Sequence, residues 1–146
     1  MTASTSTSAS PTATKFPNGI NAGSVTTASQ INTGATLVPG SVVTGITAHA
    51  GGGQGSAVVL TGEFNRVDTV TTAADSVALP APSYVGQQIT VVNNAAANSM
   101  QVFGSGTDTI NGVATATGVA QAAGKMAIYR AATIGTAAAW FRLLSA

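Results

Sequence analysis

Short apolar segments, separated by turn residues about every eight to twelve positions, are the feature of this chain that most limits its fold. Seven such segments lie in the second half: SAVVL (56–60), VDTVT (67–71), SVAL (76–79), QQITVVN (87–93), SMQVFG (99–104), KMAIYRA (125–131) and AAWFRLL (138–144). The alanines of GVAQAAGK lie between two glycines, in a stretch too short for a stable helix. The pattern predicts an all-β fold, a small antiparallel β-sandwich or jelly-roll domain.

Two of these segments alternate with the period of a strand that has one buried face. Ile89 and Val91 alternate with Gln88, Thr90 and Val92 in QITVVN, and Met126 and Ile128 alternate with other residues in KMAIYR. Asn111-Gly112 between them predicts a tight hairpin turn.

Charge divides the chain into two parts. Before Glu63 the only charged side chain is Lys15, and the glycines of GGGQG (51–55) interrupt regular structure between the parts. We therefore predict an extended N-terminal arm over residues 1–50 and a β domain over residues 51–146. Within the arm, SVVTGITA and INTGATLVPG have strand character, and KFPNGI contains a tight turn.

The low charge content excludes several classes of partner. Charged residues make up 6% of the chain, with five Lys and Arg against four Asp and Glu, whereas soluble domains have about 25%. No basic cluster could bind nucleic acid, and no apolar run approaches the roughly 18 residues that span a bilayer. We expect no export signal, because the N-terminus lacks a basic start and an apolar stretch. A surface with so few charges is expected to be covered by protein neighbours.

No arrangement of reactive residues predicts an enzyme, a metal site or a cofactor. The chain has no cysteine, its one histidine is His49, and its acids occur singly, as Glu63, Asp68, Asp75 and Asp108. Asp68 and Asp75 lie beside Thr or Ser at strand ends, where aspartate usually caps a turn. In GVAQAAGKM the spacing is one residue too long for a phosphate-binding loop, and Met126 replaces the Ser or Thr that reaches magnesium.

The aromatic residues of the last two predicted strands leave two roles open. Tyr129, Trp140 and Phe141 could fill the core or a subunit interface, or they could form a platform for sugar stacking. We favour the first role and predict Trp140 and Phe141 as core or oligomer-interface residues.

The first fourteen residues, MTASTSTSASPTAT, are uncharged and rich in Ser and Thr. Ordering them costs roughly 14 to 28 kcal/mol of backbone entropy. Because small side chains cannot offset this cost on one small domain, we expect the arm to become ordered against other chains. Phe16, Pro17 and Ile20 are the first residues that could anchor it.

Residues 75–144 contain the series ITVVNN, NSMQVF, DTINGVA, AAGKMAIY and a final Trp. This series resembles small β domains of tailed-bacteriophage structural proteins, and KFPNGI resembles the opening of such proteins. The resemblance implies a capsid decoration (cement) protein, commonly trimeric, on the outer capsid surface of the virion.

In such a protein the arm, with Phe16, Pro17 and Ile20, bridges neighbouring copies of the major capsid protein. The resemblance brings no catalytic residue and no cofactor, and it implies neither nucleic acid nor membrane as a partner. The alternative within the same group is a head-fibre or tail-fibre module that binds host surface glycans.

Overall fold

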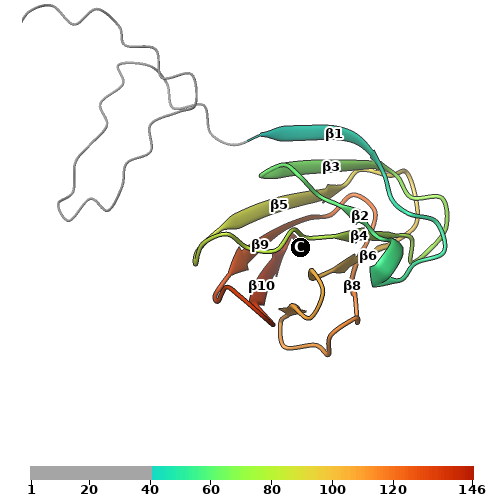
Figure 1. Ribbon diagram of the computed structural model, residues 1–146. Helices are drawn as coiled ribbons and strands as arrows, with labels where there is room; N and C mark the ends of the chain where they lie inside the picture. The colour runs from blue at the N-terminus through green and yellow to red at the C-terminus, as the bar shows by residue number, and fades with distance from the viewer. Residues whose placement is uncertain (1–40) are drawn as a thin grey trace, which may run out of the picture. The chain divides into compact units, whose positions relative to one another are not determined.

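The computed structural model describes residues 41–146, and these residues form an all-β fold with one short 3₁₀ helix, η1 (Gln54–Ser56). The first sheet contains, in spatial order, β1 (Val42–Thr47), β3 (Phe64–Thr69), β5 (Gln88–Asn93), β9 (Met126–Ala131), β10 (Ala139–Leu144) and β7 (Thr109–Ile110). The second sheet contains β2 (Val58–Val59), β4 (Ser76–Ala78), β6 (Met100–Phe103) and β8 (Val119–Gln121). Figure 1 shows β1, β3 and β5 side by side in the first sheet.

The strand positions predicted from the sequence are confirmed. Each of the seven predicted segments contains or overlaps an observed strand, namely β2, β3, β4, β5, β6, β9 and β10. The segment SVVTGITA also contains a strand, β1, which pairs with β3 in the first sheet. Residues 41–50 of the predicted arm therefore contribute a strand to the sheet, whereas KFPNGI and INTGATLVPG lie outside the described residues.

The prediction of an antiparallel fold is wrong for five of the eight strand pairs, because both sheets are mixed. The pairs β1–β3, β3–β5, β2–β4, β4–β6 and β7–β10 are parallel, whereas β5–β9, β9–β10 and β6–β8 are antiparallel. Between β1 and β9 the chain moves from one sheet to the other at every strand. A parallel pair needs a crossover connection, and here the crossover is a strand of the other sheet instead of a helix.

The number of residues between one strand and the next parallel strand of the same sheet varies little. In the first sheet, 22 residues separate Val42 from its partner Phe64, and 26 separate Phe64 from its partner Thr90. In the second sheet, 19 residues separate Val58 from Val77, and the next pair is 25 residues apart. Successive turns of the chain therefore stack in the manner of repeat proteins, in which each turn contacts its neighbours.

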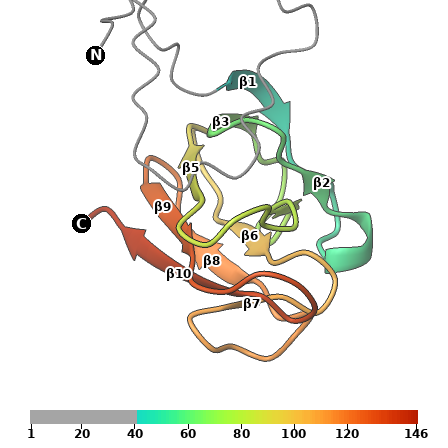
Figure 2. The same ribbon diagram turned by 60° about the vertical axis from the view of Figure 1, so that its left-hand side comes forward.

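The last two strands, β9 and β10, do not continue this series of stacked turns. Strand β9 runs antiparallel to both of its neighbours, β5 and β10, and Figure 2 shows the order of the first sheet from β1 at the top to β7 at the bottom. The turn at Asn111-Gly112 is present, with φ of 52° and 72°, as a tight turn with two left-handed residues requires. The predicted hairpin is wrong, because β7 before this turn pairs with β10.

One hydrophobic cluster contains side chains of both sheets. Val67, Ile89, Val91, Tyr129 and Trp140 come from the first sheet, and Val77, Met100, Val102 and Val119 come from the second. The cluster confirms Ile89 and Val91 as core residues. In β9 the buried residues are Ala127, Tyr129 and Ala131, so Met126 and Ile128 face the other way.

Candidate interaction surface

The outward face of the first sheet is built from rows of paired residues. Paired positions on adjacent strands carry their side chains on the same face. Because Ile128 pairs with Thr90 and with Leu143, these three residues form one row across β5, β9 and β10. Gln88, Arg130 and Phe141 form the next row across the same three strands.

Large apolar side chains are exposed on this face of the sheet. Phe141 is 60% exposed, Leu143 71% and Met126 41%. Ile128 is half-buried between them. We call Met126, Ile128, Phe141 and Leu143, together with the neighbouring Val85, the outer patch. Exposed apolar side chains that gather on one face mark an interaction site, whereas scattered ones do not.

Two shallow hollows lie beside Phe141. The first, of about 280 Å³, is lined by Val85, Gly86, Arg130, Ala131, Ala132 and Phe141. The second, of about 350 Å³, is lined by Gln88, Ile128, Arg130, Phe141, Arg142 and Leu143. Arg130 and Phe141 are common to both hollows, so they form a ridge with an apolar depression on either side.

Among the Lys and Arg side chains of residues 41–146, Arg130 is the one that has no described hydrogen-bond or ion-pair partner. Arg66 pairs with Asp68 at 2.8 Å, and Lys125 donates to the carbonyl of Ala146. Arg142 donates to the carbonyl of Ala120 at 2.7 Å. The guanidinium of Arg130 is therefore available to a ligand or a partner chain.

The two aromatic residues predicted for an oligomer interface point in opposite directions. Trp140 has no exposed surface and belongs to the core cluster. Phe141 follows it on β10 and lies in the outer patch. A sugar-stacking platform could therefore use Phe141 but neither Trp140 nor the fully buried Tyr129. The arm residues Phe16, Pro17 and Ile20 lie outside the described residues.

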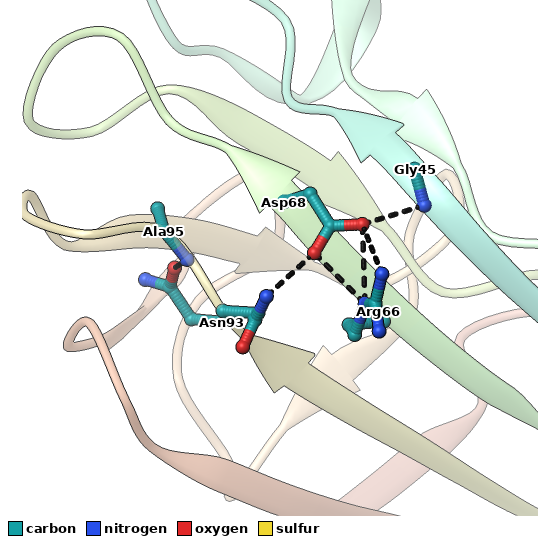
Figure 3. Close-up of polar contacts among 6 residues, drawn as sticks. Gly45, Arg66, Asp68, Asn93 and Ala95 are labelled. Atoms are coloured by element: carbon teal, nitrogen blue, oxygen red, sulfur yellow. Dashed lines mark hydrogen bonds and ion pairs between the residues drawn. The ribbon is translucent and has the colours of Figure 1, made fainter.

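Asp68, on β3 of the same sheet, forms hydrogen bonds with β1 and with the residue that follows β5. It accepts a hydrogen bond from the backbone amide of Gly45 at 2.7 Å (Figure 3). It also accepts one from the side-chain amide of Asn94 at 2.7 Å. The Arg66 guanidinium also donates to it, and these hydrogen bonds hold the pKa of Asp68 below its usual value. Gly45, with φ of 73°, lies at an irregularity in the register of β1, so Asp68 stabilises the bulged edge strand.

Asp75 has a separate structural role at the start of β4. Its carboxylate accepts hydrogen bonds from the hydroxyl of Thr72 at 2.6 Å and from the backbone amides of Gly51, Thr71 and Thr72. These hydrogen bonds, above all that of the Thr72 hydroxyl, hold the pKa of Asp75 below its usual value. The turn-capping role predicted for Asp75 is confirmed, and Asp68 and Asp75 share no hydrogen-bond donor.

We predict that the domain loses stability in acid because of these two carboxylates. Their folded-state pKa values lie below the unfolded value of about 4, so they stabilise the fold above that pH. The contribution falls as the pH drops through the folded-state pKa values. Urea unfolding at a series of pH values should show a smaller acid dependence for Asp75→Asn than for the wild type. An unchanged dependence would contradict this role for Asp75.

The remaining candidate reactive groups do not form a described site. His49 is exposed, and its backbone pairs with that of Ser76. Asp108 accepts a hydrogen bond from the backbone amide of Ala138 at 2.8 Å. In residues 41–146 no three His, Asp or Glu side chains gather as metal ligands would. The same residues contain no helix with the length and apolar character of a membrane span.

Of the outer patch, only Phe141 was predicted from the sequence as an interaction residue. The alternation in AAWFRLL carries enough information to add Leu143, because Leu143 and Phe141 share the face opposite Trp140. Arg130 and Val85 could not be found in this way, since the pairing of β9 with β10 and the path of the chain before β5 bring them to Phe141.

Searches of protein-family models, of curated proteins and of solved structures found no match to this chain. The resemblance to tailed-bacteriophage structural proteins therefore rests on the sequence segments that carry it.

Proposed function

We propose that this chain is a structural protein of a tailed-bacteriophage virion that decorates and stabilises the outer capsid surface. It assembles as a homotrimer and bridges neighbouring copies of the major capsid protein. The observation that supports this proposal best is the outer patch, where Phe141 and Leu143 are 60% and 71% exposed on a regular sheet face. Such a face is typical of a surface that another protein covers.

The composition supports the same proposal. Charged residues make up 6% of the whole chain, so little charge would have to be desolvated when its surface is covered. The proposal includes packing of the two sheets as a β-sandwich, since one hydrophobic cluster contains residues of both. In this arrangement the inner faces make the core, and the outer face of the first sheet is left for partners.

The proposed mechanism uses two points of attachment. The domain binds one capsid subunit, and the N-terminal arm, through Phe16, Pro17 and Ile20, binds a neighbouring subunit. Linking the two contacts in one chain makes the second binding step intramolecular, which can raise the overall affinity by about 10² to 10⁴. A protein that binds the assembled lattice in this way stabilises it by mass action.

We predict that deletion of residues 1–20 leaves the domain folded and strongly weakens attachment to capsids. The reason is that the deletion removes one of two linked contacts, for which we expect at least about a 100-fold loss of affinity. Co-sedimentation of the full chain and of the truncated chain with undecorated capsids measures the difference. A matched control is the triple variant Phe16→Ser, Pro17→Ser and Ile20→Ser, which keeps the length of the arm.

The outcomes separate the alternatives. Attachment of the truncated chain with unchanged affinity would contradict the bridging mechanism. Failure of the full chain to bind any capsid surface, together with its presence on purified fibres, would replace the proposal with that of a fibre module. Circular dichroism of the truncated chain checks that its strands are intact.

A further inference from the structure

The ridge of Arg130 and Phe141, at the outer patch, combines a cation that has no partner among the described residues with an exposed ring. Gln88, Arg130 and Phe141 are consecutive members of a row across three strands. All three are exposed, so a carboxamide, a guanidinium and a phenyl ring face outward together. A carboxylate can bind such a guanidinium through two parallel hydrogen bonds.

The surroundings of Arg130 determine which partner fits. Neither hollow beside the ridge is lined by an Asp or a Glu, so the patch offers Arg130 no counter-charge of its own. In an isologous contact, where the same patch of two copies meets, both copies would bring Arg130 to one interface without an acid between them. Like charges in a contact are unfavourable. The charge of the patch therefore favours a different, acidic chain over a second copy.

We infer that the outer patch binds an extended acidic segment of the capsid subunit, in which a Glu or Asp is flanked by apolar residues two positions away on each side. In an extended segment, residues two apart lie on the same face. The carboxylate then pairs with Arg130, and the flanking apolar side chains enter the two hollows. This inference rests on the proposed function and assigns Phe141 to the capsid contact instead of a contact between copies.

A peptide pair tests the charge recognition without a capsid. The peptides are acetyl-Leu-Ser-Glu-Ser-Leu-amide and the same sequence with Gln in place of Glu, titrated into the isotope-labelled full chain. We expect amide shifts at Gln88, Ala131 and Phe141, with the Glu peptide binding at least about 5-fold more tightly at low salt. The difference should shrink as the salt concentration rises, because exposed charge pairs are screened.

Variants of the chain test the role of Arg130 directly. Arg130→Gln should remove the preference for the Glu peptide. Arg130→Lys should keep part of it, since a lysine supplies the charge but cannot form the two parallel hydrogen bonds of a guanidinium. Arg66→Gln is the matched control, because Arg66 lies on the same sheet but pairs with Asp68. Equal binding of the two peptides by the wild type, or an equal preference in Arg130→Gln, would overturn the inference.

Capsid binding separates the failure of this inference from the failure of the proposed function. Arg130→Gln should weaken attachment of the full chain to capsids by about 5-fold or more, whereas Arg66→Gln should not. If Arg130→Gln attaches like the wild type, the inference is wrong and the decoration function stands. If the Glu peptide is preferred but the wild type binds no capsid, the acid-binding patch stands and the decoration function fails. Oligomers in which the outer patch is protected from solvent would identify a second copy as the occupant and overturn the inference.

Discussion

Replacement of Trp140 with alanine is expected to lower the free energy of unfolding by about 3–5 kcal/mol. Trp140 is completely buried in the cluster that joins the two sheets, so the substitution leaves a large cavity between them. A domain of this size is stable by about 5–15 kcal/mol, and the loss would bring many molecules close to unfolding. Urea denaturation followed by circular dichroism measures the change.

Two further variants test whether the stability loss comes from the buried volume of Trp140. Phe141→Ala, at the adjacent exposed residue, should change the free energy of unfolding by about 0.5 kcal/mol or less. Trp140→Phe should cost clearly less than Trp140→Ala, because Trp140 Nε1 is buried without a hydrogen-bond partner among the described residues. A loss in Phe141→Ala as large as that in Trp140→Ala would contradict the assignment of the two residues to opposite faces.

The second large effect is expected at Gln121, which joins the two sheets through a buried polar network. Its side-chain amide donates to the carbonyls of Val91 and Lys125, both at 2.9 Å, and its carbonyl accepts from the hydroxyl of Tyr129 at 3.0 Å. Gln121 is completely buried on β8. Gln121→Leu keeps much of the volume but leaves these partners unsatisfied, and each such group costs about 1–3 kcal/mol. We expect a loss of about 3 kcal/mol in the same urea experiment.

A double-mutant cycle with Tyr129→Phe checks the network. Burial of Tyr129 raises the pKa of its hydroxyl, so the group stays neutral and acts as the donor to Gln121. The two substitutions should show a coupling of about 0.5–3 kcal/mol, as residues in one network do. Gln88→Leu is the control, since Gln88 is exposed and should change stability by about 0.5 kcal/mol or less. Additive losses at Gln121 and Tyr129 would show that the hydrogen bond between them contributes nothing.

The sequence predicts where strands lie along the chain, but it does not predict which strands pair with each other. An apolar–polar alternation has the same period in parallel and antiparallel strands, so KMAIYRA does not reveal that its neighbours are β5 and β10. The turn at Asn111-Gly112 was predicted correctly because it depends on two adjacent residues. The strand before that turn, β7, depends on a distant partner, since it pairs with β10, about thirty residues along the chain.

The buried face of a strand could also not always be predicted from its own residues. Met126 and Ile128 are both large and apolar, yet the buried face of β9 carries Ala127, Tyr129 and Ala131. The register decides this, because Tyr129 pairs with the buried Ile89 on β5. The outcome leaves Met126 exposed in the outer patch.

The all-β class, the tight turn, the shortage of charge and the positions of most strands, but not those of β7 and β8, follow from the amino-acid sequence, since these properties depend on neighbouring residues or on composition. The three-dimensional structure was needed to reveal the alternation between two sheets, the parallel pairs, the separation of Trp140 from Phe141 and the position of Arg130 between two hollows. These features arise from contacts between residues far apart in the chain. Local patterns constrain such contacts only weakly, because one alternating strand can pair with several others in either direction.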